Sequence, residues 1–337
     1  MARSRVAVIG AGMAGMSASR DLARAGNEVV VFDKARGVGG RMPTRRHEAG
    51  AFDHGAQYFT ARSEVFRGQV EDWCKRGLAA IWDATIVRLD KGQITAENDP
   101  SPRYVGVPKM SVLARDLGEG LEIRCGAHVA GIERLDSGWS LTTREQGVFG
   151  GFDAVVLATP APQTIPLLPR VGSLGSARER IERVEVDPCQ AVMASFCDAL
   201  PVDFDAAFVA HSPLAWIARN GSKPGRPPGE CWVLHASPEW SQEHVDLAPE
   251  AVARELIAAL EEVLGGGLLA ADQVVAHRWL YAKTRRPEGD ACLWSAESGV
   301  GICGDWMIGS RVEDAFLSGH ALAREMQRPA FAHPADV

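Results

Sequence analysis

The sequence predicts an α/β protein with two domains, the first built on a parallel sheet and the second, smaller α+β domain built on a mixed or antiparallel sheet. Two observations lead to this prediction. Residues 5–34 contain a short apolar run, a glycine-rich turn, a helical stretch and a second apolar run, in that order. Beyond about residue 164, strand-like segments surround one clear amphipathic helix, which is typical of an α+β region.

The composition is that of an ordinary globular protein and argues against several classes of function. The 337 residues are 46% hydrophobic and 23% charged, with a formal net charge of −7. A nucleic-acid partner usually calls for a clustered basic surface, so none is expected. No apolar stretch approaches the ~20 residues that span a bilayer, and no leader precedes the first strand. We therefore expect a cytoplasmic protein that binds no membrane, with no protein partner implied.

The seven cysteines are scattered and include no CxxC pair. We therefore expect reduced thiols, with neither a metal site nor a disulfide framework. Cys303, among the glycines of "GVGICGDW", is the one candidate for a reactive thiol or a covalent cofactor link. A buried, inert thiol is the simpler interpretation of that residue.

The N-terminal stretch "RVAVIGAGMAGMSASRDL" has the context that a dinucleotide-binding turn requires. Residues 5–9 predict a buried strand that ends in glycine. Residues 13–25 predict a helix that ends at Gly26, and residues 27–34 predict a second buried strand. The GxGxxG pattern thus falls between a strand and a helix, as in a Rossmann-like unit.

Each glycine of this pattern has a physical role. Gly10 permits the tight turn, Gly12 lets the backbone approach a pyrophosphate, and Gly15 lets the helix pack closely on the sheet. The helix N-terminus offers free N–H groups to the phosphates. Asp33, at the end of the second strand, is placed to accept hydrogen bonds from a ribose. The sequence therefore predicts a bound dinucleotide, and NAD alone is one possible occupant.

The later elements define the domain boundaries. A helix is predicted from about Met110, and the helix from about Pro249 to Leu264 has an apolar stripe typical of core packing (Val252, Leu256, Leu260 and Val263). The stretch from Asn220 to Glu230 is rich in proline and glycine and predicts a surface loop. We assign the dinucleotide-binding domain to residues 1–60, 100–165 and 290–330, and the substrate domain to residues 61–99 and 166–289.

Two further stretches belong with the first turn. In "DKARGVGGRM", Gly39, Gly40 and Arg41 make a second backbone approach to phosphate, reinforced by a cation. In "GICGDWMIGSRVEDAFLSGHALA", a strand delivers Asp305 and a helix begins near Val312. If NAD alone occupied the first turn, neither stretch would have a role.

These three stretches together resemble the flavin amine oxidase superfamily, and the resemblance covers almost the whole chain. It implies an FAD-binding Rossmann-like domain that holds FAD without a covalent bond. It further implies that Asp33 binds the adenosine ribose, that Val129 holds the adenine through its backbone, and that the helix start at Val312 faces the flavin C2=O. The cofactor-binding residues assigned in this way are Gly10, Gly12, Met13, Ala14, Gly15, Asp33, Lys34, Gly40, Arg41, Met42, Gln57, Tyr58, Val129, Thr159, Asp305, Val312 and Glu313.

The stretch "DHGAQYFT", residues 53–60, together with "GGRM", is similar to the renalase family and to its bacterial members in particular. This resemblance implies an oxidase that converts the 2- and 6-dihydro isomers of NAD(P)H to NAD(P)+. FAD would take the hydride, and O2 would take the electrons to give hydrogen peroxide. The alternatives are a flavin amine oxidase acting on a small amine and a non-catalytic flavin-binding or electron-transfer protein.

The two enzymatic alternatives differ in their need for a base. A dihydronicotinamide becomes an aromatic pyridinium when it donates hydride, so stacking and alignment suffice. An amine must also lose a proton, and amine oxidases of the superfamily often place a lysine near flavin N5. Lys109, Lys223 and Lys283 all lie in plausible loops, so the sequence does not assign that role.

The candidates for substrate contacts are mostly aromatic, and core packing is the alternative for each ring. His277 is a weak candidate for a proton relay; for it, as for His54 and His235, a hydrogen-bonded structural histidine is the simpler interpretation. Arg219 and Lys223 are candidates for contacts with substrate phosphates, although a mobile cationic loop explains them equally well. The substrate-binding residues assigned are Gln57, Tyr58, Phe59, Thr60, Tyr104, Trp216, Trp279 and Trp306.

Overall fold

The protein folds into two compact units. The structure, a computed structural model, describes residues 4–48, 50–97, 99–168, 174–267 and 270–328. Unit 1 comprises residues 1–40, 114–185 and 284–337, and unit 2 comprises residues 41–113 and 186–283. The units are about equally long, so the second is not the smaller one. Residues 41–60 and 100–113 fall in unit 2 and not, as the sequence analysis assigned them, with the dinucleotide-binding residues.

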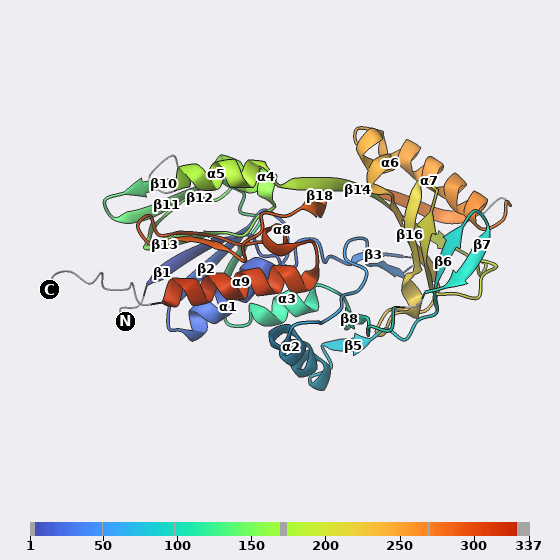
Figure 1. Cartoon of the computed structure of the whole chain (residues 1–337), viewed down its shortest axis with the longest axis horizontal. Helices are drawn as coiled ribbons and strands as arrows, with labels where there is room; N and C mark the ends of the chain where they lie inside the picture. Colours follow the sequence, from blue (N-terminus) through green and yellow to red (C-terminus); the bar gives the residue numbers. More distant parts are fainter. Residues whose placement is uncertain (1–3, 49, 98, 169–173, 268–269, 329–337) are drawn as a thin grey trace. The chain divides into compact units, whose positions relative to one another are not determined.

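Unit 1 is built on a six-stranded sheet with the order β19-β20-β13-β1-β2-β9 (Figure 1). All of its strand pairs are parallel except the pair formed by β19 and β20. The central strands are continuous apolar runs, because a parallel sheet is buried on both faces. The strands are β1 (Arg5–Ile9), β2 (Glu28–Asp33), β9 (Glu122–Cys125), β13 (Ala154–Leu157), β19 (Leu293–Ser295) and β20 (Val300–Ile302).

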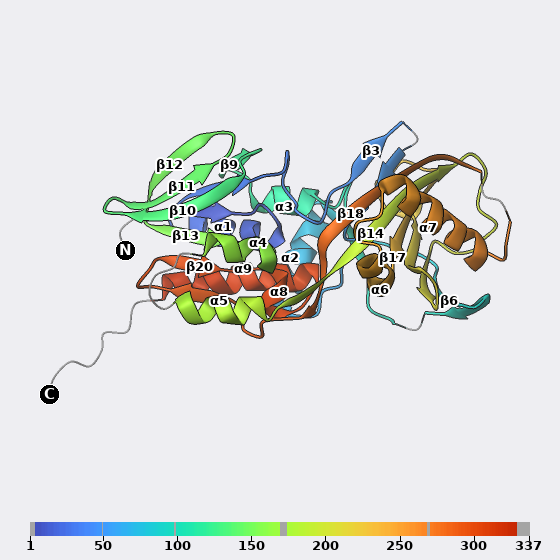
Figure 2. The ribbon, with the colours of Figure 1, turned by 90° about the horizontal axis from the view of Figure 1, so that it is seen from above.

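Two long helices of unit 1 pack side by side, α1 (Met13–Arg24) and α9 (Val312–Gln327) (Figures 1 and 2). Gly319 permits their close approach, since a Cβ at this position would lie 2.0 Å from the Ala14 carbonyl oxygen. Both helices begin where the sequence analysis placed them. The remaining helices of unit 1 are α4 (Ala161–Thr164), η1 (Ile165–Leu167), α5 (Leu174–Glu182) and α8 (Asp305–Ile308), and α3 (Val112–Leu117) crosses the unit boundary.

A three-stranded antiparallel sheet completes unit 1 (Figure 2). Its strands are β10 (Val129–Leu135), β11 (Gly138–Thr143) and β12 (Gly147–Phe152). Trp139 and Phe152 project from it into the same apolar core as Phe32 of β2. No described helix of either unit is both long enough and apolar enough to span a membrane.

Unit 2 is built on a mixed seven-stranded sheet with the order β18-β14-β17-β16-β15-β6-β7. The pair β15–β6 is parallel, whereas β14–β17, β16–β17 and β15–β16 are antiparallel. The predicted α/β class with a second, sheet-rich domain is therefore confirmed. The strands are β6 (Ile86–Asp90), β7 (Gln93–Ala96), β14 (Glu185–Phe196), β15 (Ala206–Ala210), β16 (Leu214–Arg219), β17 (Glu230–Ala236) and β18 (Ala271–Arg286).

The predicted amphipathic helix covers one face of this sheet as α7 (Pro249–Val263). Leu256 and Leu260 pack in one apolar core with Ile217 and Leu234 of the sheet. Because side chains alternate along strands, the neighbours of these two strand residues point to the opposite face. That face carries Trp216, which is paired in register with Phe208 on one side and His235 on the other.

Shorter elements surround the face of the sheet that lies opposite α7. The hairpin of β3 (Arg45–His47) and β4 (Gly50–Phe52) places Phe52 against Val233 and Val275 of the sheet. The other short elements of unit 2 are α2 (Glu64–Lys75), β5 (Ala79–Ile81), β8 (Tyr104–Gly106), η2 (Asn220–Ser222) and α6 (Pro238–Glu243).

Candidate flavin and substrate sites

The first glycine-rich turn of unit 1 has the geometry of a phosphate-binding turn. Gly10 has a φ of +112°, which a side chain would strain, and a Cβ on Gly15 would lie 1.9 Å from the Gly10 carbonyl oxygen. Gly12 is the N-cap of α1, and this helix has neither a side-chain cap nor an acidic residue in its first turn. The positive end of the α1 dipole therefore remains uncompensated by its own first turn, which favours an anionic ligand.

The second glycine pair lies directly on this turn. The Gly39 N–H donates to the Ala11 carbonyl at 2.9 Å, and a Cβ on Gly40 would lie 3.2 Å from the Gly12 Cα. Two backbone segments that the sequence separates by nearly thirty residues thus form one cradle. Arg41 follows directly and is the first residue of unit 2.

Asp33 stands at the end of β2 and organises the cradle. Its two carboxylate oxygens accept hydrogen bonds from the Ala11 and Ala35 N–H groups, at 2.6 and 2.7 Å. Burial raises the pKa of Asp33, and the two N–H donors partly offset this effect. Each oxygen keeps a further lone pair for a hydroxyl group. The neighbouring Lys34 side chain is exposed.

The C-terminal part of unit 1 supplies a second set of the predicted residues. Asp305 is the first residue of α8 and is buried, and Glu313 is buried in the first turn of α9. Asp314 also lies in that turn and accepts hydrogen bonds from the N–H groups of Ser310 and Arg311, at 3.0 and 2.9 Å. The N-terminus of α9 is therefore partly neutralised by its own acids, unlike that of α1.

The predicted cofactor contacts in unit 2 are engaged within that unit. The Arg41 guanidinium donates to the Ala282 carbonyl at 2.9 Å, and Met42 is buried. The Gln57 amide nitrogen donates to the carbonyls of Asp53 and Gly55, and its amide oxygen accepts from Lys223 Nζ at 3.0 Å.

Four aromatic rings form a cluster on the sheet face opposite α7, which we call the Tyr58 cluster. The ring centroid of Tyr58 lies 5.6 Å from that of Trp216 and 6.2 Å from that of Trp82, and Phe208 lies 4.7 Å from Trp216. The structure thus brings together the predicted residues Tyr58 and Trp216. Sequence reasoning missed Trp82 and Phe208, and only the pairing of β15 with β16 reveals that Phe208 lies beside Trp216.

The other predicted aromatic residues lie elsewhere. Phe59 is 3% exposed and stacks on Tyr104 with a centroid separation of 5.8 Å, in an apolar group with Phe66, so its placement favours core packing. Thr60 is half-buried. Trp306 is 1% exposed within the core of unit 1, where its indole N–H donates to the Thr159 carbonyl at 2.9 Å. This placement favours the packing interpretation of Trp306 over a role as a wall of the substrate site.

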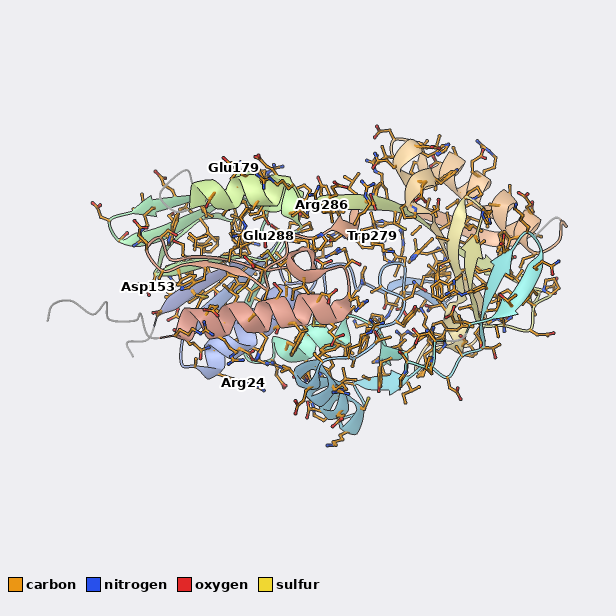
Figure 3. The ribbon with its side chains drawn as sticks, viewed as in Figure 1. Arg24, Asp153, Glu179, Trp279, Arg286 and Glu288 are labelled. Carbon is orange, nitrogen blue, oxygen red and sulfur yellow. The ribbon has the colours of Figure 1, made fainter. Side chains whose placement is uncertain are left out.

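Trp279 belongs to a second ring group, which includes two of the histidines. Trp279 extends from β18 (Figure 3) and stacks on His54 at 5.3 Å, while His277 lies 4.9 Å from His54. Burial, together with the nearby His277 and Arg45, lowers the pKa of His54 to about 4. Burial also lowers the pKa of His277, and that of His235 to about 4. These imidazoles are therefore neutral at pH 7.

Asp53, Lys223 and Arg226 form a buried ionic cluster next to Gln57, and this cluster corrects one prediction. The side chains of Asp53, Lys223 and Arg226 have no exposed surface; Arg226 contacts Asp53 Oδ2 at 2.7 Å and Lys223 contacts it at 3.4 Å. The stretch from Asn220 to Arg226 is therefore not a surface loop, since its cations Lys223 and Arg226 are buried against Asp53. Sequence reasoning missed Asp53 and Arg226, because a proline- and glycine-rich stretch carries no signal of burial.

Comparison with known proteins identifies the family of this chain. The model of the flavin-containing amine oxidoreductases matches residues 85–327, and that of an NAD(P)-binding Rossmann-like domain matches residues 8–75. The chain belongs to the flavin-containing amine oxidoreductase family. The members of this family are FAD-dependent oxidoreductases, and the cofactor of this chain is FAD.

Solved structures of two oxidases share the fold. A protein from Exiguobacterium sp. 255-15, named a candidate protoporphyrinogen oxidase, has a TM-score of 0.79 and 15% identity over 97% of this chain and 99% of its own. A putrescine oxidase solved with putrescine has a TM-score of 0.70 and 14% identity over 96% of this chain and 99% of its own. A 4,4'-diapophytoene desaturase of Staphylococcus aureus is 43% identical over 51 residues, which span 15% of this chain and only 10% of the desaturase.

The residues of unit 1 fit the FAD of this flavin-containing amine oxidoreductase. A side chain on Gly40 would crowd Gly12, since its Cβ would lie 3.2 Å from the Gly12 Cα, and the uncapped α1 N-terminus suits a pyrophosphate. Asp33 retains acceptor capacity for ribose hydroxyls. The roles assigned to Val129, Thr159, Asp305 and Val312 remain predictions. Cys303 is buried, and burial raises the pKa of its thiol, which favours the inert interpretation.

Proposed function

We propose that this chain is an FAD-dependent oxidase of dihydronicotinamide dinucleotides, acting on the 2- and 6-dihydro isomers of NAD(P)H. The observation that carries the proposal is the Tyr58 cluster, whose four aromatic rings lie in the same unit as neutral histidines and beside the cations Arg88, Arg103 and Lys223. A planar dihydropyridine is recognised by such rings through stacking, and its oxidation requires alignment and no strong base.

Lys223 supports this substrate class over an amine. Lys223 donates to Gln57 and Asn220 at 3.0 and 3.1 Å and faces Asp53, so its three donor positions are engaged. Such a lysine holds its neighbours in place and is not poised to accept a proton. Amine oxidation by this chain would need another group for that task.

The chemistry is then divided between the cofactor and the chain. The chemistry that bound FAD would supply is acceptance of a hydride from the dihydronicotinamide and transfer of two electrons to O2, which with two protons would give hydrogen peroxide. Unit 1 holds FAD through the glycine turns and Asp33. In unit 2, Tyr58 and Trp216 orient the substrate ring, and the neutral histidines add no repulsive charge to the pyridinium product.

Anaerobic mixing of the FAD-loaded protein with candidate donors tests the proposal. Rapid bleaching of the flavin absorbance by 6-dihydro-NAD, slow bleaching by NADH and none by putrescine are expected. Bleaching by putrescine alone would instead establish an amine oxidase, and a flavin that no donor reduces would indicate a non-catalytic protein. Tyr58→Phe, which keeps the ring, should retain the rate, while Tyr58→Leu should lower it about 10-fold through lost stacking.

A further inference from the structure

The indole N–H of Trp216 has no hydrogen-bond partner among the described residues, although the side chain is only 6% exposed. Five other tryptophans donate to an acceptor in the structure, namely Trp82, Trp139, Trp232, Trp279 and Trp306. A buried donor without an acceptor is costly, so such groups call for a physical explanation. Trp216 therefore differs from these five tryptophans in a way that packing alone does not require.

The unpartnered donor belongs to the Tyr58 cluster. Phe208 meets the Trp216 ring at 4.7 Å with an interplanar angle of 64°, and Tyr58 meets it at 5.6 Å. Trp82, also in the cluster, is satisfied, because its indole N–H donates to Ser222 Oγ at 3.0 Å. The cluster thus combines aromatic surface with one unused, uncharged donor.

A second unused donor lies at the same tyrosine. The Arg103 guanidinium carbon lies 5.4 Å from the centroid of the Tyr58 ring, and Arg103 Nε is also buried without an acceptor. Two unsatisfied N–H groups beside one ring indicate a ligand that carries acceptor atoms.

The chemistry of the cluster selects the kind of acceptor. The neutral indole N–H of Trp216 suits the carbonyl oxygen of a planar ring substituent, whereas a phosphate would prefer the neighbouring Arg103 guanidinium. We propose that Trp216 Nε1 donates a hydrogen bond to the carboxamide oxygen of the substrate's nicotinamide ring and so determines specificity for that group. This inference rests on the proposed function and deepens it.

A cycle of two variants and two ligands tests the inference on the full, FAD-loaded chain. Trp216→Phe removes the unused donor, and Trp82→Phe makes the same chemical change to a donor that is already bonded within the cluster. Calorimetry would measure the dissociation constants of NAD+ and of an analogue in which hydrogen replaces the carboxamide. We expect Trp216→Phe to weaken NAD+ binding about 10-fold and to leave analogue binding within about 2-fold, as for one lost hydrogen bond.

The Trp82→Phe control determines how the affinity change of Trp216→Phe is interpreted. Trp82→Phe should change the affinity for both ligands by the same factor, because its donor serves Ser222. If Trp216→Phe weakens both ligands equally, or neither, the inference is overturned, and a trapped water or packing accommodates the N–H. The inference fails in this binding assay, whereas the proposed function fails in the anaerobic reduction of the wild-type flavin, so the two failures are distinguishable.

A second measurement needs no stable variant. In protein labelled with ¹⁵N-tryptophan, the indole resonance without a partner should shift when NAD+ is added and stay in place when the analogue is added. An indole resonance that responds identically to both ligands would overturn the assignment, even if Trp216→Phe failed to fold.

Discussion

The Nζ atom of Lys223 lies 3.4 Å from the Oδ2 atom of Asp53, and neither side chain has any exposed surface. Arg226 donates to the same oxygen, and Thr44 donates to the other carboxylate oxygen at 2.5 Å. One carboxylate therefore contacts two buried cations and joins the segment that follows β4 to the segment that follows η2. Because Lys223 also holds the Gln57 amide, this junction fixes the chain immediately before Tyr58.

Asp53→Asn should lower the free energy of unfolding by about 3–5 kcal/mol, because it leaves Lys223 and Arg226 buried without a counter-charge. Urea titration followed by circular dichroism measures the change. Asp246→Asn is the matched control in the same unit, since Asp246 pairs with Arg278 while its side chain is 92% exposed. Equal effects of the two substitutions would contradict a stabilising role for the buried cluster.

Lys223 should make stability depend on pH in the alkaline range. Burial lowers the pKa of Lys223 from 10.5 to about 8, against the opposing charge of Asp53. Between these values the unfolded chain binds more protons than the folded one, so the free energy of unfolding should rise with pH, by up to about 1.4 kcal/mol per pH unit. The difference between wild type and Lys223→Met, measured by urea titration from pH 7 to 10.5, isolates this rise. A flat difference would show that Lys223 titrates normally.

Asp33→Ala should weaken the retention of FAD by roughly 1.5–3 kcal/mol, because the ribose loses a charged acceptor and the Ala11 N–H loses its partner. Fluorescence titration of the apoprotein with FAD measures the affinity. Asp136→Ala, on an exposed turn of unit 1, provides the control and should bind FAD as the wild type does. Unchanged affinity in Asp33→Ala would remove Asp33 from the cofactor site.

Two glycine-to-alanine substitutions in helices should change the stability of the chain in opposite directions. Gly319→Ala places a Cβ 2.0 Å from the Ala14 carbonyl oxygen and should force α9 away from α1, lowering the thermal midpoint by several degrees. Gly68→Ala, in α2, meets nothing within 4 Å and should stabilise the chain by about 0.5–1 kcal/mol. Thermal unfolding of both variants tests the prediction, and a stabilised Gly319→Ala would contradict the close helix packing.

Much of unit 1 could be predicted because its signals are local. Gly10, Gly12 and Gly15 occupy one turn, and the strands on either side are recognisable apolar runs, so strand, turn and helix follow from neighbouring residues. Asp33 was found for the same reason, since it ends the second of these strands. Helix α7 was found from its periodic apolar stripe, and its observed end at Val263 differs by one residue from the predicted one.

The sequence by itself therefore determined the α/β class, the glycine-rich turns and the candidates Tyr58 and Trp216. Only the tertiary structure decided that Lys223 and Arg226 are buried on Asp53, that Phe208 adjoins Trp216, and that Trp306 lies in a core. The physical reason is that these outcomes depend on partners about 170 residues away or on a neighbouring strand. Whether a charged side chain is buried depends on a counter-charge that is distant in the sequence, and no local sequence pattern encodes that contact.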